Sequence, residues 1–149
     1  MFLGEYRHSI DNKDRLTIPA RYRELLVEGA FILRGFDNNL MVLTSKAFEA
    51  ISRRISRMSM TDPGARMLRR LIMGSASRVK IDKIGRILIP EFLCEKAGIA
   101  CDQEVVLVGL GDYFEIWSSE VWALQQKTLD ELEANTERFK VLDLSTSSE

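Results

Sequence analysis

The sequence is poor in the residues that catalysis and cross-linking most often use. Its 149 residues include one histidine and two cysteines, Cys94 and Cys101. A Ser-His-Asp hydrolase or a Cys/His zinc site needs partners that this supply lacks, so we expect two reduced, buried thiols. The segment Gly109-Leu110-Gly111-Asp112 lacks the third glycine of a dinucleotide-binding loop and is interpreted as a turn. The sequence therefore predicts a protein that is not an enzyme and uses no cofactor or metal.

Long apolar runs and a leader pattern are missing as well. No run approaches the roughly 20 apolar residues that a membrane span requires. The first residues, Met1-Phe2-Leu3-Gly4-Glu5, lack the basic and apolar regions of a secretory signal. We therefore expect a cytoplasmic protein without a membrane partner. The length suits one compact domain or two very small units that share a core.

The net charge of −1 conceals a strong division of charge along the chain. Residues 1–90 carry 17 Lys and Arg against 9 Asp and Glu, whereas residues 91–149 carry 4 against 13. A basic portion of this kind is typical of a nucleic-acid-binding face if its charges converge in space. A merely solvated surface is the alternative interpretation.

The chain contains an internal repeat. Residues 9–19 align with residues 80–90 at an offset of 71, and residues 31–48 align with residues 105–122 after a three-residue gap. Five positions in the first block are identical in the two copies: Ile10 and Ile81, Asp11 and Asp82, Arg15 and Arg86, Ile18 and Ile89, and Pro19 and Pro90. Two copies, at about residues 5–48 and 76–122, predict a pseudo-symmetric fold.

Each copy predicts the same succession of elements. A strand ends at the aspartate, a tight loop and a second strand (16–18 or 87–89) follow, and a short helix starts after the proline. A hairpin comes next and turns at residues 37–39 or 111–112. Ser45 and Ser119 are the predicted N-caps of the helices that follow. The expected fold class is α+β and β-rich.

Helical spacing extends beyond the repeats. We expect a helix over residues 48–58 and a second helix that begins at Asp62-Pro63 and is stopped by Gly74. A mostly acidic helix over residues 121–132 and a frayed tail at residues 145–149 are expected after the second repeat. The arginines of the first two helices form either a solvated face or auxiliary phosphate contacts. The predicted organisation is repeat one at 1–50, a helical connector at 51–74, repeat two at 75–122, and a C-terminal helix and tail at 123–149.

The repeated Asp-x-x-x-Arg loops, Asp11–Arg15 and Asp82–Arg86, are the candidate functional motif. Each aspartate can accept hydrogen bonds from the loop N–H groups or support the arginine. Arginine can hold a phosphate with two hydrogen bonds or contact guanine in the major groove. Gly85 suits a positive-φ turn, and Asp14 takes the equivalent place in the first copy. Three lysines add positive charge near the loops: Lys13, Lys80 and Lys83. From the residues alone, either a turn held by an ion pair or a DNA contact explains the motif.

The opening Met1-Phe2-Leu3-Gly4, the two loops and Gly74-Ser75-Ala76 together resemble the MraZ family of bacterial regulators of the division and cell-wall gene cluster. The resemblance covers nearly the whole chain. It implies two AbrB/SpoVT-like swapped-hairpin units in one double-psi-like β-barrel with peripheral helices. It also implies a repressor that binds short repeated boxes of double-stranded DNA at its own operon.

Further expectations follow from the resemblance. It implies a ring-shaped, octamer-like homo-oligomer associated with the nucleoid, with DNA bound through Arg15 and Arg86. Asp14 departs from the glycine that is usual before the arginine, so the two loops are expected to contribute unequally. An AbrB-type, antitoxin-like protein-interaction module is the alternative, but such antitoxins usually carry one copy and a disordered tail. An enzyme or purely structural ring is disfavoured because no catalytic constellation is present.

Overall fold

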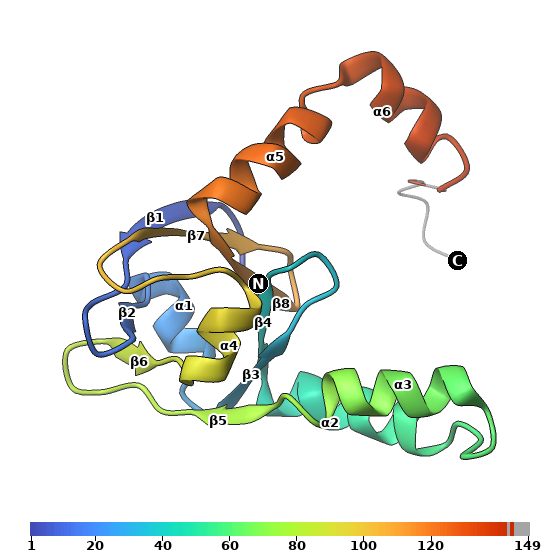
Figure 1. Cartoon of the computed structure of the whole chain (residues 1–149), viewed down its shortest axis with the longest axis horizontal. Coiled ribbons are helices and arrows are strands. Elements are labelled where there is room, and N and C mark those ends of the chain that lie inside the picture. Colours follow the sequence, from blue (N-terminus) through green and yellow to red (C-terminus); the bar gives the residue numbers. More distant parts are fainter. Residues whose placement is uncertain (143, 145–149) are drawn as a thin grey trace.

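We describe residues 1–142 and 144 in a computed structural model of the chain (Figure 1). The described residues form an α+β, β-rich fold, as expected from the sequence. Its elements, in chain order, are β1 (Glu5–Ser9), β2 (Arg15–Thr17), α1 (Ala20–Leu25), β3 (Ala30–Arg34), β4 (Leu40–Thr44), α2 (Ser45–Ser56), α3 (Pro63–Ile72), β5 (Ser77–Val79), β6 (Arg86–Leu88), α4 (Glu91–Lys96), β7 (Glu104–Gly109), β8 (Tyr113–Ser118), α5 (Ser119–Leu129) and α6 (Leu132–Phe139). The predicted frayed tail at 145–149 lies outside the described residues.

The two sequence copies exchange their first strands. Strand β1 of the first copy pairs with β7 of the second, and β5 of the second copy pairs with β3 of the first. The hairpins β3–β4 and β7–β8 join through β4 and β8, which gives a six-stranded antiparallel sheet in the order β1-β7-β8-β4-β3-β5. Strands β2 and β6, one from each copy, form a separate two-stranded ribbon. Neither copy therefore completes its own sheet.

The closed double-psi-like barrel that the resemblance implies is not formed in the described part of the chain. The six-stranded sheet is open, with β1 and β5 at its edges, because these strands reach the ribbon only through the single bridges Ile10↔Leu16 and Ile81↔Ile87. The main core lies between the sheet, the ribbon and helices α1 and α4. Its members are almost fully buried and include Ile18, Ile32, Ile89, Leu93, Leu107 and Phe114.

The N-terminal residues cross the turn of the second hairpin. The Phe2 N–H donates to the Gly111 carbonyl at 2.8 Å, and the Gly111 N–H donates back at the same distance. The Phe2 ring packs edge-on against Tyr22, with 5.1 Å between centroids, and also against Phe114. The Tyr22 hydroxyl donates to the Leu3 and Gly4 carbonyls at 3.0 and 3.2 Å, and burial raises the pKa of this phenol to about 12. Phe2 is thus part of the core, and the backbone around it is tied to the second hairpin and to Tyr22.

Two pairs of helices project from this body (Figure 1). Helices α2 and α3 form a hairpin that packs on the outer face of β3 and β4, whereas α5 and α6 extend as an arm from the end of β8. The caps of α2 and α5 are Thr44 and Ser118, so the predictions of Ser45 and Ser119 are wrong by one residue. Each cap side chain accepts from the backbone N–H three residues ahead.

The C-terminal helices and the cysteines differ in part from what the sequence predicts. The single helix predicted over residues 121–132 is wrong, because α5 ends at Leu129 and α6 begins at Leu132. Both cysteines are free, but only Cys94 is buried and Cys101 is exposed. In the part of the chain described here, no helix combines the length and apolar character that a membrane crossing requires.

Candidate functional site

The two Asp-x-x-x-Arg loops lie side by side because their strands pair. In the β2–β6 ribbon, Arg15 is opposite Leu88, and Arg86 is opposite Thr17. The central pair, Leu16 and Ile87, is fully buried. Since side chains alternate along a strand, both arginines lie on the outer face of the ribbon. The structure therefore brings together two arginines that are 71 positions apart in the sequence.

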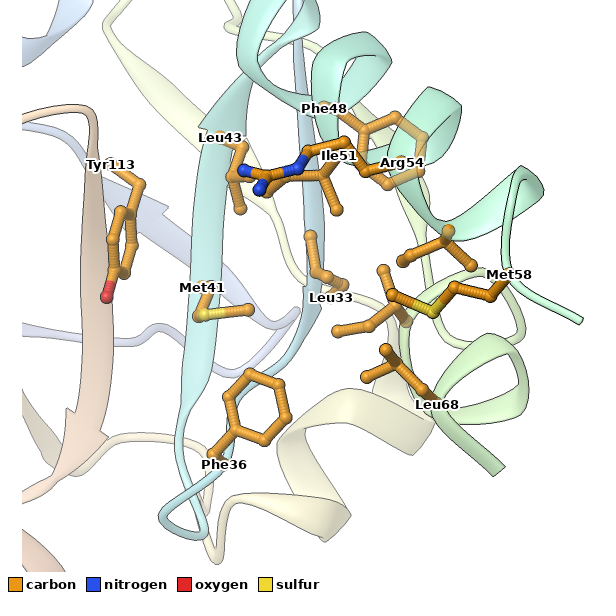
Figure 2. Close-up of a pocket in the computed structure, with 12 residues that line it drawn as sticks. Leu33, Phe36, Met41, Leu43, Phe48, Ile51, Arg54, Met58, Leu68 and Tyr113 are labelled. Atoms are coloured by element: carbon orange, nitrogen blue, oxygen red, sulfur yellow. The ribbon is translucent and has the colours of Figure 1, made fainter. Parts of the chain in front are cut away.

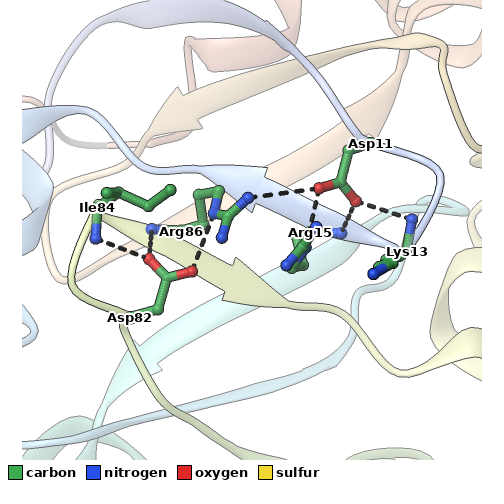
Figure 3. A network of polar contacts seen from close by, with 6 residues as sticks. All are labelled: Asp11, Lys13, Arg15, Asp82, Ile84 and Arg86. Carbon is green, nitrogen blue, oxygen red and sulfur yellow. Dashed lines mark hydrogen bonds and ion pairs between the residues drawn. The ribbon is translucent and has the colours of Figure 1, made fainter.

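Each aspartate both closes its loop and holds its arginine (Figure 3). Asp11 Oδ1 accepts from the backbone N–H groups of Lys13 and Arg15, both at 2.9 Å, while Oδ2 accepts from Arg15 Nε at 2.9 Å. Asp82 repeats this with Arg86, whose backbone N–H and Nε each donate at 2.9 Å, and it also accepts from the Ile84 N–H at 3.1 Å. The sequence offered loop closure and arginine support as alternatives, and each aspartate does both.

An ion pair also links the two loops. Arg86 Nη1 lies 3.7 Å from Asp11 Oδ2, so the first loop's carboxylate lies near both guanidinium groups. The arginine side chains are a quarter to a third exposed. Among the described residues, no acceptor forms a hydrogen bond with the Nη groups of either arginine. The forked end of each guanidinium is consequently available for a planar, two-oxygen ligand.

Hydrogen bonds lower the pKa of both loop carboxyl groups. For Asp82 the largest cause is the hydrogen bond from the Arg86 backbone N–H. Desolvation opposes it, and the hydrogen bonds from the Arg86 side chain and the Ile84 N–H lower the pKa further. For Asp11 the Arg15 backbone N–H is again the largest cause. Both carboxylates are therefore ionised at neutral pH and compensate one positive charge each. The net positive charge of this region comes from other residues.

The positions before the two arginines have the left-handed backbone that the sequence predicted. Asp14 has φ of 58° and Gly85 has φ of 83°. Their carbonyl groups connect the copies, because Ile18 N–H donates to Gly85 O at 2.9 Å and Ile89 N–H donates to Asp14 O at 2.8 Å. Each loop is thereby fixed by the strand that follows the other loop.

Arg23 also belongs to this region, although no sequence pattern indicates it. Its Nε donates to the Ile18 carbonyl at 2.8 Å, and its guanidinium lies against Gly85 so closely that a Cβ there would be 2.5 Å from Arg23 Cζ. The corresponding residue of the second copy is Cys94, which lines a hollow together with Asp14. Loop two thus has an arginine beside a glycine, while loop one has a thiol beside a carboxylate.

The lysines do not occupy matching places. Lys13 and Lys83 are exposed within loops one and two, and Lys80 lies next to Arg23 along one hollow. Loop one reads Asn12-Lys13-Asp14 between its aspartate and arginine, whereas loop two reads Lys83-Ile84-Gly85. The positive charge is therefore concentrated at loop two. In the described part of the chain, no cluster of His, Cys, Asp and Glu could hold a metal ion.

Known proteins agree with this duplicated arrangement. The family described as "MraZ protein, putative antitoxin-like" matches the chain twice, at residues 1–71 and 72–142. Similar proteins include a transcriptional regulator MraZ of Roseiflexus castenholzii, 42% identical over 93% of this chain and 94% of that protein. The regulator of the same name from Herpetosiphon aurantiacus is 43% identical over 82% of this chain and 84% of that protein. The one from Dictyoglomus thermophilum is 44% identical over 82% of each chain.

These likenesses define the class first: the chain is a transcriptional regulator and not an enzyme. It belongs to the MraZ family, because the family pattern covers both halves and the relatives match over most of the chain. The family expectation drawn from the two loops and the opening residues is confirmed.

Proposed function

We propose that this chain is a sequence-specific DNA-binding repressor of its own operon and of the division and cell-wall gene cluster. It binds short repeated promoter boxes of double-stranded DNA through the Asp11–Arg15 and Asp82–Arg86 loops. The observation that carries the proposal is the β2–β6 ribbon, which presents Arg15 and Arg86 on one outer face.

A two-stranded ribbon has the dimensions that the major groove of DNA admits. The aspartates hold each guanidinium by Nε, which fixes its plane and reduces the side-chain entropy that binding would otherwise cost. A guanidinium held in this way can pair with guanine O6 and N7 or with two phosphate oxygens. Lys13, Lys80 and Lys83 supply phosphate contacts around the two arginines, and Asp11, Asp82 and Gly85 maintain the loops.

The two loops contribute unequally in this proposal. Asp14 adds a second carboxylate to the first loop, whereas Gly85 of the second loop has the guanidinium of Arg23 as its neighbour. DNA phosphates are repelled by the first arrangement and attracted by the second. Arg86 is therefore the stronger contact of the two.

Self-association completes the proposal. A ring-shaped, octamer-like homo-oligomer repeats the ribbon, so that several weak contacts to successive boxes add up by avidity. Direct repeats suit subunits related by rotation within a ring. We place this assembly in the cytoplasm, associated with the nucleoid. Within each subunit, residues 1–50 and 75–122 act as the repeats, 51–74 as the helical connector and 123–149 as the C-terminal extension.

The test is a binding titration with labelled DNA from upstream of the chain's own gene, compared with a scrambled sequence at several salt concentrations. The wild type should prefer the native DNA, and its affinity should fall steeply with salt as counterions are released. Equal affinity for the scrambled sequence would contradict sequence-specific binding and leave a nonspecific binder.

Variants then test the loops. Arg15→Ala together with Arg86→Ala should abolish specific binding, while Arg53→Ala, an exposed arginine of α2, is the matched control and should bind normally. Each bidentate base contact contributes about 1–3 kcal/mol, and Arg86→Ala should cost more affinity than Arg15→Ala. Undiminished binding by the double variant would contradict the role of the loops. Specific capture of a small toxin-like protein, without DNA binding, would favour the antitoxin-like alternative.

A further inference from the structure

An apolar groove lies between the α2–α3 hairpin and the sheet, away from the loops. Figure 2 shows its lining: Met41, Tyr113 and Phe36 on the sheet side and Met58 and Leu68 on the helix side. Its volume is about 330 Å³, and Arg54 is the charged residue among its lining. Phe36 is 65% exposed and Met58 40% exposed, so part of this apolar surface meets solvent. A groove of this size and lining is typical of a site that receives apolar side chains.

The arm formed by α5 and α6 carries the complementary features. Leu132 and Phe139 are spaced at i and i+7 and so lie on one side of α6, and Leu142 follows three residues after the helix ends. The three side chains are 78%, 52% and 64% exposed, respectively. The arm holds a defined angle, because Arg138 Nη1 donates to the Thr128 carbonyl at 3.2 Å and Asn135 Nδ2 donates to the Leu129 carbonyl at 2.7 Å. An exposed apolar stripe on a projecting helix is typical of an association surface.

The charges of the two surfaces are opposite. Residues 45–73, which contain α2 and α3, carry seven Lys and Arg against two Asp and Glu. Residues 130–142, which contain α6, carry four Asp and Glu against two Lys and Arg. Opposite charge around apolar centres guides two surfaces together and disfavours contact between two grooves or two arms.

The arm and the groove of one chain belong to separate projections of the body (Figure 1). We propose that the α6 arm of one copy lies in the α2–α3 groove of the next copy, with Leu132, Phe139 and Leu142 against Phe36, Met58 and Leu68. This inference rests on the self-association proposed above and names the surfaces that form it. The contact joins two different surfaces and therefore repeats head to tail, which produces a ring when the rotation closes. The ribbon lies on the side of the body away from both projections, so the contact leaves it uncovered.

The experiment measures the mass of the full chain in solution by light scattering. Phe36→Glu places a charge in the groove and leaves the arm intact. Phe139→Glu places a charge on the apolar side of the arm and leaves the groove intact. Each variant should lose the oligomer and behave as a monomer. Met67→Glu is the matched control, because Met67 is an exposed methionine of α3 that does not line the groove. This control should assemble like the wild type.

Mixing the two variants is the decisive step. One intact arm and one intact groove remain in the mixture, so it should form a one-to-one dimer that grows no further. If either variant keeps the full oligomer, or if the mixture stays monomeric while both proteins show the wild-type circular dichroism spectrum, the proposed contact is wrong. A monomeric wild type would overturn self-association itself, whereas loss of DNA binding with an intact oligomer would leave this contact unaffected.

Charge reversal covers the case in which a glutamate in the groove prevents folding. Arg54→Glu should weaken the assembly without filling the groove, and Glu133→Arg with Glu137→Arg in the same chain should restore it. Failure of the combined variant to recover any oligomer would count against the contact.

Discussion

Position 85 is restricted by its own backbone and by a neighbouring side chain. Its φ of 83° disfavours a side chain, and a Cβ would also meet the Arg23 guanidinium. Gly85→Ala should therefore lower the free energy of unfolding by about 1–3 kcal/mol, measured by urea denaturation. Part of this loss should be recovered when Arg23→Ala is added, because the contact disappears while the backbone strain remains. Strict additivity of the two substitutions would contradict the proposed contact.

Asp82 should titrate below its usual range because backbone and side-chain donors favour its ionised form. A lowered folded-state pKa stabilises the protein above the unfolded-state pKa of about 3.9, and this contribution is lost as the pH falls through the folded-state value. NMR titration of the carboxyl carbon gives this pKa directly. In Arg86→Ala the pKa should rise only in part, since the backbone N–H of residue 86, its largest cause, remains. Complete return to the usual value would show that the side chain dominates instead.

For individual residues, the sequence predicted the Asp–Arg pairs because the two residues are close in the sequence and the pair occurs once in each copy. It also predicted the positive φ of Asp14 and Gly85, which depends only on residue type and loop position. Arg23 could not be predicted in the same way. It contacts Gly85 across the boundary between the copies, and its counterpart is a cysteine, so the repeat gives no second instance.

The helix caps can be tested as elements. Thr44→Ala and Ser118→Ala each remove a side-chain acceptor at the start of α2 or α5, and each should lower the free energy of unfolding by about 1 kcal/mol. Ser45→Ala is the control, because the cap interaction belongs to its neighbour, and it should change stability by less than about 0.5 kcal/mol. Thermal or urea unfolding measures all three. A larger loss of stability in Ser45→Ala than in Thr44→Ala would show that Ser45 is the N-cap of α2, as the sequence predicted.

Most helices and strands could be predicted from the sequence, since turns, prolines and apolar spacing are local signals. Which strands pair with each other could not be predicted. The pairing of β1 with β7 and of β5 with β3 depends on contacts between distant residues, and nothing in either strand specifies it. The break between α5 and α6 was also missed, because Asp130 and Glu131 are residues that a helix also accepts. There, Glu131 has a non-helical ψ of 79°.

For the whole molecule, the N-terminal residues are the clearest test of how the halves are held together. Phe2 is buried against Tyr22 of the first copy and Phe114 of the second. Phe2→Ala should therefore lower the free energy of unfolding by about 3–5 kcal/mol, the usual cost of removing a buried aromatic ring. Leu3→Ala is the neighbouring control, since Leu3 is exposed. Equal melting temperatures of the two variants would show that this segment does not stabilise the core.

Because the two copies exchange strands within one chain, the two ends of the β2–β6 ribbon carry different residues. In a dimer of identical single-copy chains, every substitution at the ribbon occurs twice and the two-fold symmetry is exact. Here one chain supplies both loops, so Asp14 and Gly85 differ, as do Arg23 and Cys94, while the shared sheet keeps the ribbon intact. The ribbon is therefore directional, and a ligand that spans both loops meets different chemistry at its two ends. Such a ligand has one preferred orientation, and successive subunits in a head-to-tail assembly would all impose the same one.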